Sequence, residues 1–277
     1  MSIWLEESHT PGYRVLWKIN EILWREQTKY QELMVVDTLE FGRALVLDGA
    51  VQTTERDEFI YHEMISHVAL NSHPNPRQVL IIGGGDGGTL REVLRHPGIE
   101  RVDMVEIDQR VVELSKQYLP TIASGFDDPR AHVHFEDGVR FVKESKKRYD
   151  LIIVDSSDPV GPAVELFGLD FYRDAFGVLT ADGIMVAQAE SPIYYKAYLQ
   201  KVWRNIKSTF PIGYVYLASI PTYVSGFWSF VIGSKCHDPR SVRGDKPSLF
   251  GLKYYTEEVH RASFVIPPFV LGVLDEA

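Results

Sequence analysis

Short apolar and polar runs alternate over the first part of the chain. Between Tyr13 and about Thr54, the runs YRVLWKI, EILWREQ, YQELMVVDT, FGRALVLDG and VQTTE have the composition of β-strands. The residues between these runs are Asn20, Thr28, the Phe41-Gly42 pair and the Asp48-Gly49 pair. Because Asn, Asp and Gly tolerate the backbone angles of tight turns, we predict a small antiparallel sheet. It would form an N-terminal β domain over residues 1–56.

The pattern then changes to a helix. Asp57 and Glu58 begin it, because carboxylates favour a helix N-terminus. Ile60, Met64 and Val68 then recur at helical spacing.

Continuous apolar runs alternate with amphipathic segments through the rest of the chain. The runs are VLIIG, VDMVEI, VHF, LIIVD and GIMVAQ. Such runs between helices indicate a parallel, doubly wound sheet that is buried on both faces, so the fold class is α/β. We interpret VYLASI and FWSFVIG as antiparallel edge strands, and TEEVHRASFVIPPFV as helical and then irregular. Residues 57–277 would form this second domain.

Composition excludes several classes of protein. The chain has 277 residues, 45% of them hydrophobic and 24% charged, which excludes a disordered tail, a collagen-like repeat and a coiled coil. The net charge of −9 argues against a nucleic-acid partner and suits a cationic one. Cys236 is the only cysteine, so an intrachain disulfide and a cysteine-based zinc cluster are both excluded.

We predict neither a membrane span nor a signal peptide. No apolar run approaches the roughly 18 residues that a span needs, and the first segment, MSIWLEESHT, is acidic where a signal peptide is basic. We therefore expect a cytoplasmic protein without a membrane partner.

A glycine-rich loop follows the first strand of the predicted parallel sheet. Residues 83–88 read GGGDGG, which satisfies the G-x-G-x-x-G pattern through Gly83, Gly85 and Gly88. NAD or FAD would be the usual inference. Asp86, however, places a negative charge where a pyrophosphate would lie, so a cationic or neutral ligand fits better. Alternatively, Asp86 only caps the following helix.

The next two strands also end in carboxylates. Glu106 lies about 20 residues past the glycine loop, a distance at which an acidic residue binds the ribose hydroxyls of an adenosine. NAD enzymes and S-adenosylmethionine enzymes share this feature. Glu136, Asp137 and Gly138 follow the third strand, where a carboxylate can accept the amino group of adenine. For Glu106, the alternative is a solvated carboxylate at a strand end.

The fourth strand is followed by the sequence DSSDPVGP. Asp155 and Asp158 are three residues apart, and two prolines stiffen the loop after them. Ligands bind at the carboxyl ends of the strands in an open doubly wound sheet, so we predict a site for one or more ammonium groups. The alternative is a pair of turn-forming aspartates.

Six segments together resemble the polyamine aminopropyltransferase family. They are LDGAVQTTERDEFIYHEM (47–64), HPNPRQVLIIGGGDGG (73–88), MVEID (104–108), DSSDPVGPA (155–163), IPTYVSG (220–226) and KYYTEEVHRASFVIP (253–267). The resemblance extends from the N-terminal sheet nearly to the C-terminus.

The resemblance implies a Rossmann-like, methyltransferase-type doubly wound sheet behind a small N-terminal antiparallel β domain, assembled into homodimers or homotetramers. Such enzymes transfer an aminopropyl group from decarboxylated S-adenosylmethionine to an amine. With putrescine as the acceptor, the products are spermidine and methylthioadenosine. The donor is a co-substrate, and neither a metal nor another cofactor is implied.

The resemblance also assigns residues to each part of the site. For the adenosine part these are Gln31, Glu106, Asp137, Gly138 and Pro162. Asp86 would bind the amino end of the aminopropyl chain, and Asp155 would be the catalytic base. On the amine-substrate side, together with both aspartates, would lie Tyr61, His62, Asp158, Gln188 and Tyr223, with Glu190 a further candidate.

Other functions stay open at this stage. The acceptor can be putrescine, cadaverine, agmatine or spermidine, since spacing does not measure pocket depth. An S-adenosylmethionine-dependent amine N-methyltransferase is the second hypothesis, and Asp86 with the acidic loop disfavours it. An NAD-dependent oxidoreductase is supported only by the glycine pattern and Glu106. A silent adenosine-binding protein would be expected to have lost Asp155 or Tyr61.

Overall fold

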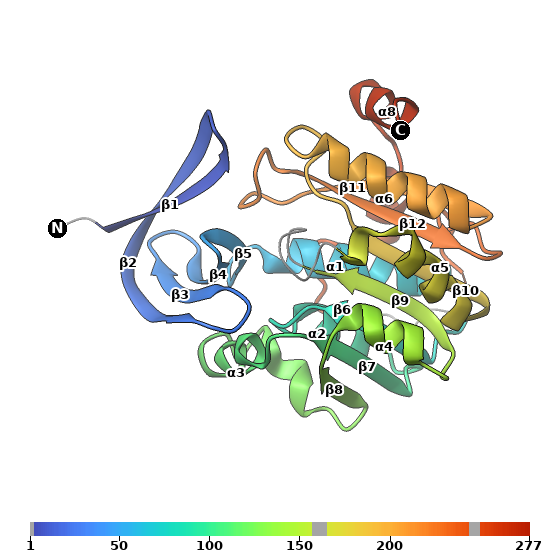
Figure 1. Cartoon of the computed structure of the whole chain (residues 1–277), viewed down its shortest axis with the longest axis horizontal. Helices are drawn as coiled ribbons and strands as arrows, with labels where there is room; N and C mark the ends of the chain where they lie inside the picture. Colours follow the sequence, from blue (N-terminus) through green and yellow to red (C-terminus); the bar gives the residue numbers. More distant parts are fainter. Residues whose placement is uncertain (1–2, 157–164, 244–249) are drawn as a thin grey trace.

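The chain folds into two sheets with helices packed around the larger one (Figure 1). The computed structural model describes residues 3–156, 165–243 and 250–277. Among these residues, none of the helices has the length and apolar character required to cross a membrane.

The N-terminal sheet is antiparallel, with its strands in sequence order. They are β1 (Ile3–Thr10), β2 (Tyr13–Gln27), β3 (Glu32–Thr38), β4 (Gly42–Leu47) and β5 (Ala50–Thr54). The sequence reading missed β1 and divided β2 at Asn20. That residue lies in an irregularity, where the β2–β3 register shifts between Ile19 and Glu21, so the strand continues through it.

The larger sheet has seven strands. They are β6 (Gln78–Gly83), β7 (Arg101–Glu106), β8 (Ala131–Phe135), β9 (Tyr149–Asp155), β10 (Leu179–Gln188), β11 (Ile212–Ser219) and β12 (Phe227–Ser234). Their order is β11-β12-β10-β9-β6-β7-β8, and β6 to β10 pair in parallel. This confirms the doubly wound prediction. The run FWSFVIG is not an edge strand, because β12 lies between β10 and β11 and pairs antiparallel with both.

Helices cover both faces of this sheet (Figure 1). They are α1 (Glu58–Ser72), α2 (Gly88–Leu94), α3 (Gln109–Tyr118), the 3₁₀ helix η1 (Ala123–Asp127), α4 (Gly138–Glu144), α5 (Leu169–Val178), α6 (Lys196–Thr209), α7 (Glu257–Ser263) and α8 (Pro268–Asp275). Successive residues of β6 show why its apolar run is continuous. Ile81 packs in one core with α1 and α2, whereas Leu80 and Ile82 pack in the other core with α5 and α6. The prediction of an irregular C-terminal stretch is partly wrong, since Pro268 begins the helix α8 there.

The helix α1 is buried along nearly its whole length, and its polar side chains have specific partners. The Glu63 carboxylate accepts hydrogen bonds from the backbone N–H groups of Lys253, Tyr254 and Tyr255, at 2.8 to 2.9 Å. Asn71 donates to the Tyr255 hydroxyl at 2.8 Å. The C-terminal segment is thereby fixed against the helix that follows the N-terminal sheet.

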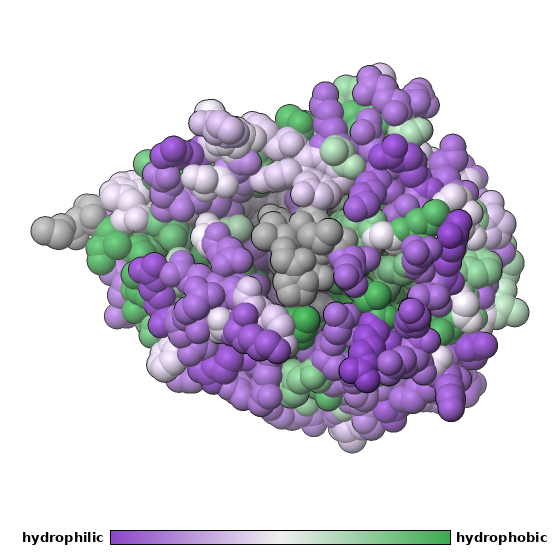
Figure 2. All heavy atoms as spheres, in the orientation of Figure 1, coloured by the Kyte–Doolittle hydropathy of each residue, from purple (hydrophilic) through white to green (hydrophobic). Residues whose placement is uncertain are grey.

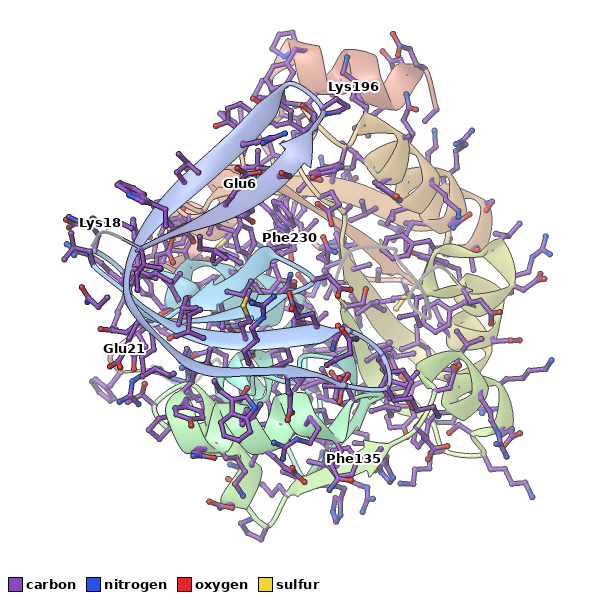
Figure 3. The ribbon with its side chains drawn as sticks, turned by 60° about the vertical axis from the view of Figure 1, so that its left-hand side comes forward. Glu6, Lys18, Glu21, Phe135, Lys196 and Phe230 are labelled. Carbon is purple, nitrogen blue, oxygen red and sulfur yellow. The ribbon has the colours of Figure 1, made fainter. Side chains whose placement is uncertain are left out.

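The N-terminal sheet packs against α3. Leu33 and Leu45 share a small apolar core with Leu114 and Ile122. In Figure 3 the β1–β2 hairpin stands in front of the larger sheet, and Phe230, which is fully buried, lies in the interior behind it. The sheet therefore stands beside the carboxyl ends of the parallel strands.

Candidate active site

A cavity of about 340 Å³ lies between the two sheets, and both sheets contribute to its walls. The carboxyl ends of β6, β7 and β9 form one wall, and residues of β1, β4 and β5 form the other. The predicted site residues that line it are Gln31, Tyr61, His62, Asp86, Glu106, Asp137, Gly138, Asp155, Gln188 and Tyr223. Asp158 and Pro162, which were also predicted, lie outside the described residues.

The glycine-rich turn lies directly against the end of β9. Gly83 has φ +82°, and a Cβ atom there would lie 2.2 Å from the Asp155 carbonyl oxygen. The next backbone N–H, that of Gly84, donates to the same oxygen at 2.8 Å. Only glycine allows this close approach, which brings the Asp86 loop next to Asp155.

Both carboxylate oxygens of Asp155 accept hydrogen bonds from side chains. The Tyr61 hydroxyl donates to Oδ1 and the Thr89 hydroxyl donates to Oδ2, each at 2.6 Å. Burial and the neighbouring Asp86 carboxylate raise the pKa of Asp155 above its ordinary value. Burial and Asp155 also raise the pKa of Tyr61 well above its usual value, so its hydroxyl keeps its proton. Sequence reasoning missed Thr89, because only the fold brings α2 to the end of β9.

Asp86 is held by one backbone group and one ring. The backbone N–H of Gly88 donates to Oδ1 at 2.8 Å, which shows that Asp86 also serves the start of α2. The Nε2 atom of His62 lies 3.3 Å from Oδ2. The Asp86 side chain is 11% exposed and lines the cavity, so its charge is available to a ligand.

Glu106 is buried beside the glycine-rich turn. Its Oε1 atom accepts a hydrogen bond from the backbone N–H of Asp108 at 2.9 Å. A Cβ atom on Gly85 would lie 2.8 Å from its Oε2, so the carboxylate is in contact with that loop. Burial raises the pKa of Glu106 to about 7, although the backbone hydrogen bonds act in the opposite direction.

Two further predicted residues are positioned by caps and loops around this part of the cavity. Gln31, between β2 and β3, donates to Asp108 Oδ2 at 3.1 Å. Asp137 caps α4 by accepting from the backbone N–H groups of Val139 and Arg140. Gly138 follows it, and a Cβ atom there would lie 2.6 Å from Ile82.

The remaining predicted residues lie on the other side of the cavity. The Tyr223 hydroxyl donates to the carbonyl oxygen of Gln52 at 2.6 Å, and its ring lies 5.7 Å from that of Tyr61. The amide of Gln188 donates to the carbonyl oxygen of Ser156 at 3.1 Å and to Glu190 at 3.3 Å. The structure thus brings Gln188 and Glu190 together at the end of β10.

Sequence reasoning missed the lining residues that β1 contributes. Glu7 is 4% exposed and accepts from the Trp17 indole at 2.8 Å and from the Val51 backbone at 3.0 Å. His9 lines the same wall. The Pro11-Gly12 turn was the signal that could have revealed β1, because a Pro-Gly pair after an alternating run predicts a hairpin.

A second cluster could be considered for a metal. His73 and His237 have their Nε2 atoms 3.4 and 3.7 Å from Asp182 Oδ2, in an arrangement compatible with three ligands. However, the backbone N–H of Asn75 donates to His73 Nδ1 at 3.2 Å. In the neutral ring this places the proton on Nε2, where a metal would have to bind. The cluster is therefore better described as a histidine–aspartate contact.

Two family models match the chain. The family model described as the spermine/spermidine synthase domain matches residues 58–242, and that of the spermidine synthase tetramerisation domain matches residues 3–55. A polyamine aminopropyltransferase of Desulforudis audaxviator is 52% identical, with 98% of each chain covered. One from Moorella thermoacetica is 50% identical, with 99% of this chain and 96% of the relative covered.

Solved structures show the same fold. A spermidine synthase in complex with the transition state analogue AdoDATO has a TM-score of 0.93 and 40% identity, covering 99% of this chain and 96% of the other. The spermidine synthase of Thermotoga maritima has a TM-score of 0.90 and 39% identity, covering 99% and 94%. The chain therefore belongs to the spermine/spermidine synthase family of polyamine aminopropyltransferase enzymes.

Proposed function

We propose that the enzyme transfers the aminopropyl group of decarboxylated S-adenosylmethionine to putrescine, giving spermidine and methylthioadenosine. The observation that carries this proposal is the juxtaposition of Asp86 and Asp155 in one cavity with Glu106. Two neighbouring carboxylates can each bind an ammonium group of a substrate, and a third carboxylate can accept hydrogen bonds from the hydroxyls of a ribose. The AdoDATO complex of a related spermidine synthase supports a donor of this kind.

The adenosine part would bind along β7 and α4. Glu106 would accept hydrogen bonds from the ribose hydroxyls, and Asp137 would accept one from the amino group of adenine. Gln31 and Gly138 complete this wall from opposite sides. Pro162 is proposed for the same part on sequence alone.

Asp86 would bind the ammonium group of the aminopropyl chain. Ordinary S-adenosylmethionine carries a carboxylate on that chain, and Asp86 would repel it. At about 4 Å, two like charges repel by on the order of 4 kcal/mol at an effective dielectric of about 20. The same charge that binds the donor would therefore exclude its carboxylated precursor.

The transfer is a displacement at the methylene carbon next to the sulfonium. The amine lone pair forms the new C–N bond, the C–S bond breaks, and its electron pair stays on sulfur as a neutral thioether. The leaving group needs no proton, whereas the attacking amine must lose one, because aliphatic ammonium groups have a pKa of about 10. A base beside the amine is thus the main chemical requirement.

We assign that role to Asp155. Its raised pKa makes it a better base than an exposed aspartate, and its negative charge would stabilise the ammonium that forms as the C–N bond closes. Tyr61, which keeps its proton, would fix the orientation of the carboxylate through Oδ1.

The acceptor would lie between Asp155 and the wall formed by β1 and β10. Tyr223 and Gln188 line this part of the cavity, and Glu7 and Glu190 add two buried acidic side chains. A diamine such as putrescine carries a second ammonium group that suits such a wall. Asp158 is proposed for the acceptor on sequence alone.

The N-terminal sheet would assemble the enzyme into a homotetramer, the larger of the two predicted oligomers. Trp4 and Leu16 of the β1–β2 hairpin are 54% and 59% exposed, and hydrophobic residues gather at the N-terminal end of the molecule in Figure 2. Such side chains on adjacent strands favour burial against another subunit. The match to a tetramerisation domain over residues 3–55 supports this.

Methylthioadenosine release from the purified enzyme tests the reaction. We expect release with decarboxylated S-adenosylmethionine and putrescine, and at least about tenfold less with the ordinary donor, because repulsion of the size given above far exceeds 1.4 kcal/mol. Asp86→Asn should narrow this preference. If the enzyme prefers cadaverine, agmatine or spermidine to putrescine, that amine is the acceptor and the proposal for putrescine is wrong. Methyl transfer from the ordinary donor would instead indicate an N-methyltransferase.

Asp155→Asn should lower kcat by about 10²-fold or more, because the variant keeps the volume of the side chain and loses the base. Methylthioadenosine affinity, measured by calorimetry, should change by less than about threefold, since Glu106 is untouched. Glu144→Gln, an exposed carboxylate on α4, is the matched control. If Asp155→Asn kept most of its turnover, the base would lie elsewhere.

Glu106 should make the unliganded fold less stable as the pH rises. Its pKa of about 7 lies above the value near 4.5 in the unfolded chain, so stability is full below about pH 4.5 and is lost as the pH rises through 7. Relative to the unchanged protein, Glu106→Gln should therefore gain about 2 kcal/mol of unfolding free energy between pH 5 and pH 8. Urea denaturation measures this, with Glu144→Gln as the control. Equal pH dependence of the two variants would contradict the assignment.

Replacing Trp4 and Leu16 by glutamate should dissociate the tetramer, because burying two new charges at the interface is costly. Light scattering coupled to size-exclusion chromatography gives the mass. Leu271→Glu makes the same kind of change on α8, where Leu271 is 46% exposed, and should leave the mass unchanged. A monomeric unmodified enzyme, or a tetramer that survives both replacements, would overturn this assembly.

A further inference from the structure

His62 lies behind the Asp86 loop. Its side chain is 3% exposed, and a Cβ atom on Gly88 would lie only 2.2 Å from its ring. The ring meets that of Tyr61 edge-on, at 5.4 Å and 89°. Glycine at position 88 thus leaves the space that the ring occupies at the start of α2, and the ring lines the cavity with only a small exposed part.

Both ring nitrogens of His62 face carboxylates. Nδ1 lies 2.6 Å from Glu58 Oε2, and Nε2 lies 3.3 Å from Asp86 Oδ2. A carboxylate only accepts hydrogen bonds, so both contacts are satisfied only when the ring carries two N–H groups and a positive charge. Burial opposes this charge, but Asp86 and Glu58 raise the pKa of His62 well above its usual value.

Glu58 has a second cationic partner in Arg91, whose Nε atom also donates to Glu92 at 2.8 Å. The Arg91 guanidinium donates to both carboxylate oxygens of Glu58, at 3.0 and 2.8 Å. Burial works against ionisation of Glu58, yet His62 and Arg91 lower its pKa to about 2. The His62 ring thus lies between Glu58 and Asp86, and Arg91 supplies a second positive charge on the Glu58 side.

We propose that His62 is a positively charged positioning residue, which orients the Asp86 carboxylate beside Asp155. The inference rests on the proposed function, in which Asp86 binds the ammonium group of the donor. It changes the role that the sequence resemblance gave to His62, from contact with the amine to support of Asp86. Asp86 and Asp155 repel each other, and a cation next to Asp86 reduces the electrostatic cost of placing Asp155 beside it.

Other groups around His62 set the expected pH effect. Glu58 and Tyr61 come from α1, Asp86 from the glycine-rich loop, and Asp155 from β9, where it lies within electrostatic reach. Tyr61 stays neutral, so loss of His62 would remove a positive charge that lowers the pKa of Asp155. Asp155 would then hold its proton to higher pH.

The test compares His62→Gln with His67→Gln. His67 is equally buried on α1, but it bonds Glu92 and His96 instead of Asp86. In His62→Gln we expect the acidic limb of kcat/KM for the donor to move up by about one pH unit. The donor KM should rise about tenfold at pH 7 and recover at pH 9, whereas His67→Gln should keep the original pH profile. If His62→Gln does not fold, Glu58→Gln should give a smaller shift in the same direction.

A second readout needs no activity. In the unliganded enzyme, the ring ¹³Cε1 signal that His62→Gln removes should stay in its protonated position from pH 5.5 to 8.5. A signal that titrates near pH 6.5 would overturn the proposal even if the enzyme is active. If His62→Gln raised only the KM of the acceptor, by the same factor at every pH, the result would overturn the proposal and indicate direct contact between His62 and the acceptor amine. Absence of turnover with every amine would contradict the proposed function. The NMR signal would still report the charge of His62 in that case, so the two proposals can fail separately.

Discussion

The site depends on placing several carboxylates close together, and largely out of contact with water, at the carboxyl ends of the parallel strands. An isolated buried charge is costly, and like charges close together add to that cost. Each carboxylate is therefore given donors: two hydroxyls for Asp155, a backbone N–H and a ring for Asp86, and a backbone N–H for Glu106. The glycine-rich turn is part of the same solution, because its close contact with β9 brings these groups together.

The helix α1 links this arrangement to the rest of the fold. Three successive residues have different tasks: Tyr61 donates to Asp155, His62 lies against Asp86, and Glu63 accepts from three backbone N–H groups of the C-terminal segment. Because α1 makes contacts with several elements, it is buried on nearly all sides. The ion pair between Glu58 and Arg91 then joins α1 to α2, so the two elements that flank Asp86 are held together.

The sequence predicted much of this because parallel topology converts spacing into proximity. Once β6, β7 and β9 were recognised, Asp86, Glu106 and Asp155 had to meet at one sheet edge. The i, i+4 spacing of Glu58 and His62 on a helix was also readable. The packing of His62 on Gly88 was not, since it depends on how α1 and α2 approach each other.

The errors have equally local causes. Asn20 is a residue type that favours turns. Here it lies in an irregularity of β2, and the strand continues because β3 pairs with it on both sides. The acidic wall supplied by Glu7 depends on where the N-terminal sheet packs, and β3 and β4 make apolar contacts with α3 and with the segment that follows it. Periodicity within one strand carries no information about such contacts between elements.

The cost of burying the carboxylates is consistent with the cationic substrates of the proposed function. Ligands that bind only the folded state stabilise it by mass action, so ammonium groups bound by Asp86 and Asp155 would offset part of that cost. A carboxylated donor would add charge of the wrong sign at the same place. In this view, the acidic character of the cavity would contribute both to affinity and to donor choice, and the positive charge of His62 would hold Asp86 in the orientation that both require.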